Sequence, residues 1–144
     1  TMDGANIEIR EEVGEENIFI FGLRAEEIKE LKLAHTYNPS QICAANPNLK
    51  RVMDSFESDV FCREEPGLFK WIYEYLVLNG DVYFNVADFE SYRETQALAG
   101  AEYRKREEWA RKAILNVARM GKFSSDRTIS EYAGDIWSVG PEDE

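Results

Sequence analysis

The stretch TMDGANIEIREEVGEENIFIFG, residues 1–22, carries the first indications of the fold. Its early Asp-Gly pair favours a turn, and Ile9–Val13 predicts a single helical turn that Gly14 ends. Asn17–Gly22 is a short apolar run closed by glycine, which predicts a buried β-strand. A turn, a short helix and a strand in this order are typical of a slice of an α/β unit, so we expect an α/β fold that is rich in helices.

Composition indicates a packed domain and restricts its partners. The 144 residues suffice for one domain, and 44% hydrophobic with 12% aromatic residues fits a globular core. The 17 Lys and Arg against 28 Asp and Glu give a net charge of −11, a sign that repels phosphate backbones and anionic lipids. No run approaches the roughly 20 apolar residues of a membrane span. We therefore expect neither nucleic acid nor a membrane as a partner.

The two cysteines, Cys43 and Cys62, do not form a recognisable disulfide framework. A bridge between them stays open, but two isolated cysteines in an acidic chain rich in Lys and Glu are more typical of reduced thiols. Reduced thiols fit a cytoplasmic location, which is the compartment we expect.

Caps and apolar stripes predict several amphipathic helices after residue 22. Asn46 before Pro47 is typical of an N-cap followed by proline at the first helical position. Another helix could start from the turn at Tyr37–Ser40, and Asp88 is expected to cap a long polar helix beginning near Phe89. The predicted apolar faces are those of Ile28 and Leu31; Leu49, Val52, Met53 and Phe56; Phe69, Ile72, Tyr73 and Leu76; Trp109, Ala113, Ile114 and Val117; and Ile129, Tyr132, Ala133, Ile136 and Trp137. The last set has the cleanest helical spacing.

A second strand is predicted at Asp81–Val86, which is rich in β-formers and bounded by glycine and aspartate. Five or six predicted helices against two or three short strands leave these strands without neighbours in a sheet. We therefore expect their companion strands before Thr1, in a larger protein of which this chain is a fragment.

The DGAN segment, Asp3–Asn6, is a candidate loop for ligand binding, because glycine allows positive φ and a close approach of backbone N–H groups. The alternative is a structural turn in which the side chains of Asp3 and Asn6 bond to the local backbone, and we favour this interpretation. The glycine spacing matches neither a P-loop nor a dinucleotide-binding fingerprint.

The GKFSSDR segment, Gly121–Arg127, is a second candidate anion site, because it combines Lys122, two hydroxyls and a predicted helix N-terminus. Asp126, however, places a negative charge where an anion would lie. Ser124 or Ser125 would serve as an N-cap, and Asp126 in the first turn suits the helix dipole. We favour helix capping over anion binding here.

Residues for acid–base, nucleophilic or metal chemistry do not cluster in the sequence. The glutamates form adjacent pairs on helix faces that we expect to be exposed: Glu11–Glu12, Glu15–Glu16, Glu26–Glu27, Glu64–Glu65 and Glu107–Glu108. Catalytic carboxylate pairs instead need a pocket that separates their pKa values. His35 is the only histidine, and no second ligand stands at metal-binding spacing from it. We expect no catalytic, cofactor-binding or metal-binding residue in this chain.

Several blocks of the chain resemble the C-terminal end of the α-glucan phosphorylases, the family of the glycogen, starch and maltodextrin phosphorylases. The blocks are TMDGANIEI and GEENIFIFG near the start, GLFK at 67–70, DFESY at 88–92, REEW at 106–109 and GKFSSDRTISEYAGDIW at 121–137. They stand in the family's order from Thr1 to about Val139, and the first and last blocks are highly specific to it.

The resemblance implies part of a glycosyltransferase of the GT-B type, in which two Rossmann-like domains face a cleft and a lysine holds pyridoxal phosphate as an imine. That lysine would lie just upstream of the block matching Thr1–Glu8, so we expect no cofactor on this chain. Lys122 belongs to a different block and is not its counterpart. Residues 1–144 would form the C-terminal part of the cofactor-side domain, with a polar tail at about 138–144.

The resemblance also implies a function. The parent enzyme would release glucose 1-phosphate from α-1,4-glucan and phosphate, and this chain would be an inactive scaffold whose partner is the upstream part of the parent. The alternative is a stand-alone glucan-binding or protein-interaction module derived from that domain. Trp109 and Trp137 lie on apolar stripes and are expected in the core, which leaves Trp71 as the undecided sugar-stacking residue.

Separation from a parent would leave apolar surface uncovered. In folds of this type the last helix commonly crosses towards the N-terminal domain, so the stripe at Ile129–Trp137 would lack its partner here. Unpaired sheet edges and apolar patches recruit other chains. We therefore expect this chain to self-associate or to bind the missing segment.

Overall fold

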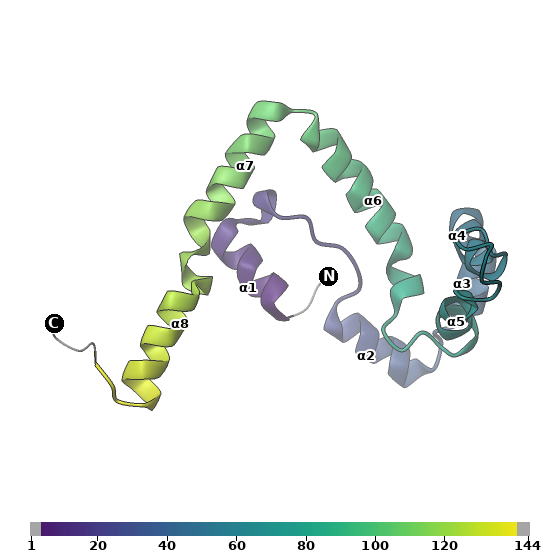
Figure 1. The fold of residues 1–144 in the computed structure, drawn as a ribbon, viewed down its shortest axis with the longest axis horizontal. Helices are drawn as coiled ribbons and strands as arrows, with labels where there is room; N and C mark the ends of the chain where they lie inside the picture. The colour runs from purple at the N-terminus through teal and green to yellow at the C-terminus, as the bar shows by residue number, and fades with distance from the viewer. Residues whose placement is uncertain (1–3, 141–144) are drawn as a thin grey trace. The chain divides into compact units, whose positions relative to one another are not determined.

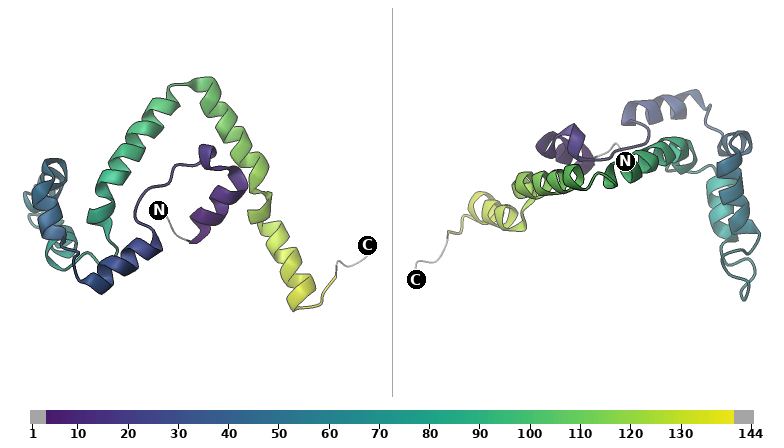
Figure 2. Two further views of the ribbon diagram at one scale, coloured as in Figure 1. Left: turned by 180° about the vertical axis from the view of Figure 1, so that it is seen from behind. Right: turned by 90° about the horizontal axis from the view of Figure 1, so that it is seen from above.

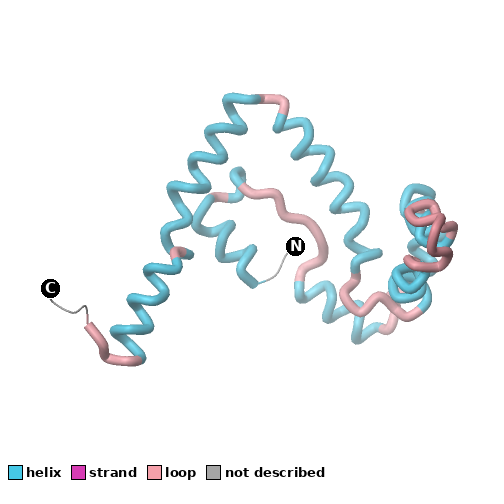
Figure 3. The backbone as a smooth tube through the Cα atoms, viewed as in Figure 1, coloured by secondary structure: helices cyan, strands magenta, loops and turns pink. Residues whose placement is uncertain are grey.

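The computed structural model describes residues 4–140, and every regular element in that range is helical (Figures 1 and 3). The backbone contacts divide the chain into two units, of which unit 1 is Ile20–Ala97 and unit 2 combines Gly4–Phe19 with the residues from Leu98 onward. The helix α6 (Asn85–Tyr103) begins in unit 1 and ends in unit 2. None of the helices within residues 4–140 has both the length and the hydropathy needed to cross a bilayer.

Unit 1 consists of four further helices and the first part of α6. These helices are α2 (Ala25–Ala34), α3 (Pro39–Ala45), α4 (Pro47–Glu57) and α5 (Lys70–Tyr73). The chain continues from α5 into a π-helical turn over Glu74–Leu78. The helices α3, α4 and α5 lie side by side (Figure 2). The predicted helices of this region are confirmed.

Asparagine side chains start two of these helices. The side-chain oxygen of Asn38 accepts a hydrogen bond from the N–H of Gln41 at 3.0 Å. The side-chain oxygen of Asn46 accepts hydrogen bonds from the N–H groups of Asn48 and Leu49, both at 3.1 Å. Proline follows each asparagine at a position where no intrahelical donor is needed. The predicted starts of α3 and α4 are therefore confirmed.

The core of unit 1 lies where the faces of its helices meet. Its buried members are Cys43, Leu49, Met53, Val77 and Val86, and Ile42, Phe56, Tyr73, Leu76 and Phe89 pack against them. The predicted stripes of α4 and of the helix after Phe69 thus supply much of this core. Cys43 and Cys62 are both free, which confirms the predicted thiols.

Unit 2 is built around α1 (Gly4–Val13) and α7 (Arg106–Arg119), which lie alongside each other (Figure 2). The remaining elements are 3₁₀ turns over Glu15–Asn17 and Met120–Phe123, the helix α8 (Ser125–Glu131) and a π-helical turn over Tyr132–Ile136. Gly14 follows α1 with φ of 91°, a conformation that glycine adopts without steric cost. The predicted end of the first helix is confirmed, and the helix begins earlier than predicted.

The predicted strand at Asn17–Gly22 is wrong. Ile18 is extended, with φ of −137° and ψ of 145°, but the segment pairs with no strand among residues 4–140. An extended apolar segment becomes a strand only where a neighbour supplies the ladder of backbone hydrogen bonds. The expected α/β fold is therefore replaced by an all-helical one within the described residues.

The predicted strand at Asp81–Val86 is also wrong. Asp81 and Phe84 have φ of 42° and 61°, in the left-handed region that a strand excludes. The buried carboxylate of Asp81 accepts hydrogen bonds from the N–H of Val86 at 2.6 Å and from the side chain of Asn85 at 2.8 Å. These bonds hold a turn that leads directly into α6.

The first turn of α6 differs from its prediction. The helix begins at Asn85 rather than near Phe89, so Asp88 lies inside it and is not its cap. The carboxylate of Asp88 instead accepts a hydrogen bond from the N–H of Leu23 at 2.8 Å. A capping residue is needed at the true start, and Asp81 fills that role by folding back on the first turn.

Two further predictions fail at the ends of the chain. Gly4–Asn6 lies in α1, so both the candidate ligand loop and the favoured structural turn are wrong for these residues, and Asp3 lies outside the described residues. The stripe that begins at Ile129 is helical as predicted, but Ile136 and Trp137 are 64% and 60% exposed. Trp137 is thus not a core residue, because no described element covers this face. The predicted tail at about 138–144 lies largely outside the described residues.

Candidate functional site

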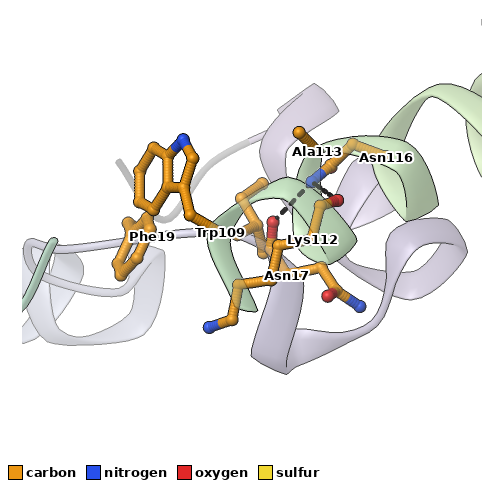
Figure 4. Close-up of a pocket in the computed structure, with 7 residues that line it drawn as sticks. Asn17, Phe19, Trp109, Lys112, Ala113 and Asn116 are labelled. Atoms are coloured by element: carbon orange, nitrogen blue, oxygen red, sulfur yellow. Dashed lines mark hydrogen bonds between the residues drawn. The ribbon is translucent and has the colours of Figure 1, made fainter. Parts of the chain in front are cut away.

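A cavity of about 360 Å³ lies in unit 2, between α7 and the segment that follows the first 3₁₀ turn (Figure 4). Its lining residues are Asn17, Ile18, Phe19, Trp109, Lys112, Ala113 and Asn116. The four residues from α7 are spaced i, i+3, i+4 and i+7, so one face of this helix forms a wall. The cavity was not predicted, because the sequence does not show which segment covers that face.

Aromatic side chains form one wall of the cavity (Figure 4). The rings of Phe19 and Trp109 stack with centroids 5.9 Å apart and planes inclined by 21°. Tyr103 meets Trp109 edge-on at 5.2 Å, and Nζ of Lys112 lies 5.5 Å from the centroid of Phe19. Each such contact contributes about 1 kcal/mol. Trp109 is half-buried in these contacts, in keeping with its predicted packing role.

The polar groups of the cavity are already bonded. The side-chain nitrogen of Asn116 donates to the carbonyls of Asn17 and Lys112 at 2.8 and 2.9 Å, drawn as dashed lines in Figure 4. Lys112 forms an ion pair with Glu102. The lining residues include no nucleophile paired with a base. The cavity can therefore accommodate an apolar or aromatic group, but its described residues do not support a covalent or acid–base reaction.

The candidate anion site at Gly121–Arg127 has its cations paired with carboxylates. Nζ of Lys122 lies 2.6 Å from Oε1 of Glu12, and this hydrogen bond raises the pKa of Lys122. The guanidinium of Arg127 bonds to Glu131 at 2.6 Å and to the carbonyl of Lys122 at 2.9 Å. Because both cations already have partners, the described geometry does not support anion binding.

The helix α8 begins where the sequence predicts, directly after Ser124, but the predicted side-chain cap is not formed. Ser124 occupies the N-cap position, but its hydroxyl accepts no hydrogen bond from the first turn. Its carbonyl instead accepts from the N–H and the hydroxyl of Thr128, both at 3.2 Å. Asp126 lies in the first turn as predicted, where a carboxylate interacts favourably with the helix dipole.

The other residues considered in the sequence include His35, Glu27 and Asn6, which lie in or at the ends of helices. His35 ends α2 in a left-handed conformation with φ of 52°, and its N–H donates to the carbonyl of Lys32 at 3.3 Å. Within residues 4–140 no three His, Cys, Asp or Glu side chains are placed to hold a metal ion. Glu27, from one of the glutamate pairs, accepts a hydrogen bond from the N–H of Arg24 at 2.7 Å and so caps α2. Asn6 lies half-buried in α1.

The buried carboxylate of Asp81 is the centre of a polar cluster that we did not predict from the sequence. The hydroxyl of Tyr37 donates to it at 2.7 Å, in addition to the two donors at the start of α6. Burial, followed by this hydrogen bond, raises the pKa of Tyr37 well above its usual value. An aspartate shortly before a helix is a capping signal, but we assigned that signal to Asp88 instead. The contacts give Asp81 a structural role.

Comparison with known proteins identifies the family. The profile described as carbohydrate phosphorylase matches residues 1–139. The chain is 52% identical over 141 residues to the glycogen phosphorylase of Synechocystis sp., covering 98% of this chain and 16% of that relative. It is 47% identical over 139 residues to the glycogen phosphorylase of Chlamydia trachomatis, covering 96% of this chain and 17% of the relative. It is 46% identical over 143 residues to the brain form of glycogen phosphorylase from Homo sapiens, covering 99% of this chain and 17% of the relative.

The chain therefore spans 16–17% of the length of these curated relatives, although the relatives match almost all of it. A family profile that covers nearly the whole sequence, together with these identities, shows common ancestry with part of a glycogen phosphorylase. This chain belongs to the carbohydrate phosphorylase family.

Proposed function

We propose that this chain is the C-terminal scaffold portion of an α-glucan phosphorylase and has no activity by itself. The proposed parent releases glucose 1-phosphate from the ends of α-1,4-glucan, with phosphate as co-substrate and pyridoxal phosphate as cofactor. One observation carries the proposal: the family profile matches residues 1–139, while the matched relatives are roughly six times as long as the chain. The partner of the chain would be the rest of the parent polypeptide.

The lysines of the chain do not fit an imine site for pyridoxal phosphate. A lysine that forms such an imine is activated by desolvation in a pocket or by a neighbouring cation. Among residues 4–140, every lysine except Lys112 is exposed, and Lys112 is paired with the carboxylate of Glu102. These surroundings support the proposal that this part of the parent, which we place in the cofactor-side domain on the family resemblance alone, does not hold the cofactor.

Exposed apolar side chains also support a scaffold role. Leu33, Ile114, Val117 and Ile136 are 72%, 68%, 81% and 64% exposed. Ile114 and Val117 are adjacent on α7 at i and i+3, and neighbouring exposed apolar side chains mark interaction sites in soluble proteins. In the proposed parent the remaining polypeptide would cover them.

An activity assay with two protein samples tests the proposal. The first is this chain with pyridoxal phosphate, maltodextrin and phosphate, and we expect no glucose 1-phosphate and no imine absorbance. The second is a chimera in which this chain replaces the 141 matched residues of the Synechocystis enzyme, and we expect it to retain phosphorolysis. The unaltered enzyme serves as the positive control. Turnover by the chain alone, or an inactive chimera, would contradict the proposal.

A glucan-binding module is the second candidate, and the exposure of Trp71 favours it. This side chain is 63% exposed on α5, where its ring could stack on a sugar. Affinity electrophoresis in gels with and without glycogen separates the two functions. A scaffold would have the same mobility in both gels. A glucan-binding module would be retarded in the glycogen gel, and the substitution Trp71→Ala would abolish that retardation.

A further inference from the structure

Asn79 and Gly80 lie in unit 1, in an exposed turn between the π-helical turn and α6. We propose that this pair is a site of spontaneous covalent modification, at which Asn79 deamidates and the backbone rearranges in part to isoaspartate. The only co-reactant is water. The reaction takes place in the folded chain and does not depend on the proposed function.

The sequence distinguishes Asn79 from the other asparagines. It is the only asparagine followed by glycine, which has no side chain to hinder an attack by its own backbone nitrogen. Asn38 and Asn46 each precede proline, which has no N–H with which to attack. The remaining asparagines precede isoleucine, leucine or valine, whose branched side chains crowd the same approach. Asn79 is therefore the most reactive asparagine on sequence grounds.

The structure leaves the peptide group between Asn79 and Gly80 free to turn. The N–H of Asn79 donates to the carbonyl of Glu74 at 2.8 Å, but no described residue bonds to the carbonyl or the side chain of Asn79, or to the N–H of Gly80. Asn79 has ψ of 16°, and Gly80 has φ of 91°, which glycine adopts without steric cost. Rotation about these two bonds can bring the nitrogen of Gly80 to Cγ of Asn79 without the loss of a hydrogen bond to any described residue.

The reaction is an intramolecular substitution followed by hydrolysis. The backbone nitrogen of Gly80 loses its proton and attacks Cγ of Asn79, so that a C–N bond forms, the bond from Cγ to Nδ2 breaks, and ammonia leaves with a proton. The resulting five-membered imide then adds one water molecule. Opening at one carbonyl gives aspartate, and opening at the other gives isoaspartate, in which the backbone runs through Cβ. The attack is effective because both groups belong to adjacent residues.

The modification would reach the buried carboxylate of Asp81, which lies two residues after Asn79. The N–H of Asp81 donates to the carbonyl of Tyr75 at 3.4 Å, and its carboxylate accepts from Tyr37 and Val86 at 2.7 and 2.6 Å. Isoaspartate adds one atom to the backbone of this turn and would shift Asp81 away from these partners. Buried polar groups that lose a partner destabilise the folded state. We therefore expect the modification to weaken unit 1 as the chain ages.

Peptide mapping of the aged chain tests the proposal. The folded chain and the chain in concentrated urea are kept at mildly alkaline pH, and the tryptic peptide of residues 71–93, which contains Asn79 and Asn85, is analysed by mass spectrometry at intervals. Asn85 is the internal control, because it is also exposed but the N–H of Val86 after it is bonded to Asp81. In the folded chain Asn79 should convert to aspartate and isoaspartate about tenfold faster than Asn85. Its rate should lie within about threefold of the rate in urea.

The comparison with urea distinguishes a site in the folded chain from the reactivity of any unfolded chain. Conversion of Asn79 no faster than that of Asn85 in the folded chain, or conversion in urea alone, would overturn the proposal. Aspartate without isoaspartate would also overturn it, because direct hydrolysis of the side-chain amide gives aspartate only.

Two variants test the effect on stability. In Asn79→Gln the attack would have to form a larger ring, so conversion should slow by about tenfold or more, and ageing should leave urea unfolding unchanged. Freshly prepared Asn79→Asp carries the new charge on a normal backbone and should unfold like the unaged chain. The aged, unaltered chain should unfold at a lower urea concentration than both. Equal unfolding of the fresh and the fully converted chain would show that isoaspartate does not disturb the turn of Asp81.

Discussion

At the scale of single residues, the carboxylate of Asp81 supplies a hydrogen-bond acceptor to a backbone N–H at the start of α6 that has no partner inside the helix. Asp81 is fully buried and accepts hydrogen bonds from Tyr37, Asn85 and Val86. Gly80 and Asp81 both have positive φ between the π-helical turn and α6, and the carboxylate of Asp81 joins this turn to Tyr37 and to the start of α6. Charge-assisted hydrogen bonds of this kind are stronger than neutral ones when they are shielded from water.

Removal of this carboxylate should destabilise unit 1. We expect Asp81→Ala to lower the free energy of unfolding by about 3 kcal/mol, because the hydroxyl of Tyr37 and the N–H of Val86 lose their buried acceptor. Urea denaturation followed by circular dichroism measures the change. The control is Asp54→Ala, which breaks only the exposed pair with Lys50 and should leave the transition in place. Equal losses in both variants would contradict the structural role.

The hydroxyl of Tyr37 should make the fold sensitive to alkali. Burial and the bond to Asp81 raise its pKa in the folded chain above its value in the unfolded chain, which is near 10. Between the two values the folded state holds a proton that the unfolded state has lost, so unfolding becomes easier as pH rises. The contribution is complete below pH 10 and declines above it. In the Tyr37→Phe variant the free energy of unfolding should therefore fall less steeply with pH from about pH 10 upwards than in the parent chain. The control is Tyr83→Phe, at an exposed ring, which should keep the steeper fall of the parent chain. Parallel curves for all three proteins would refute this.

At the scale of elements, the helices could be predicted and the strands could not. Caps and apolar stripes are local signals, and Asn38, Asn46 and the stripe from Leu49 to Phe56 led to the correct helices. A strand is not a local property, because its stability comes from a neighbour that can be far away in the sequence. Ile18–Phe21 has the composition of a strand and Ile18 has an extended backbone, yet within residues 4–140 the segment has no strand partner.

The second strand failed for a different reason. In Asp81–Val86 the β-forming side chains were outweighed by one buried aspartate, whose bonds require left-handed residues on the way to α6. The cavity beside Trp109 was missed because the face of α7 was visible in the sequence but its covering segment was not. The existence of each helix could therefore be predicted, whereas some helix starts and every contact between distant segments could not: α6 begins before Asp88, and the hydroxyl of Ser124 does not cap α8.

The double cap of α4 offers a test at this scale. We expect Asn46→Ala to lower the free energy of unfolding by about 1–2 kcal/mol, because two N–H groups at the start of the helix lose their acceptor. The neighbouring substitution Asn48→Ala is the control, since the backbone of Asn48 and not its side chain takes part in the cap. Thermal melts of the three proteins at one pH give the comparison. A larger effect at Asn48 than at Asn46 would show that the cap is not what starts α4.

At the scale of the whole molecule, two opposing features govern association: apolar side chains exposed to solvent and a net charge of −11. The apolar side chains favour contact between copies, and the charge opposes it over a distance set by salt. Val117 on α7 and Ile136 after α8 are 81% and 64% exposed, so their burial between copies would be favourable. Because the electrostatic term is screened and the hydrophobic term is not, salt should decide the balance.

Sedimentation should therefore show a monomer at low salt and association at high salt. Raising the salt from about 0.05 to 1 M shortens the screening length to about 3 Å, which removes most of the repulsion between exposed charges. Ile136→Glu should suppress the association, because it puts a charge on the apolar face. Gln96→Glu adds the same charge at an exposed polar position of α6, and it should associate like the parent chain. A monomer at every salt concentration, or equal suppression by both variants, would mean that the apolar face of Ile136 does not bind a second copy.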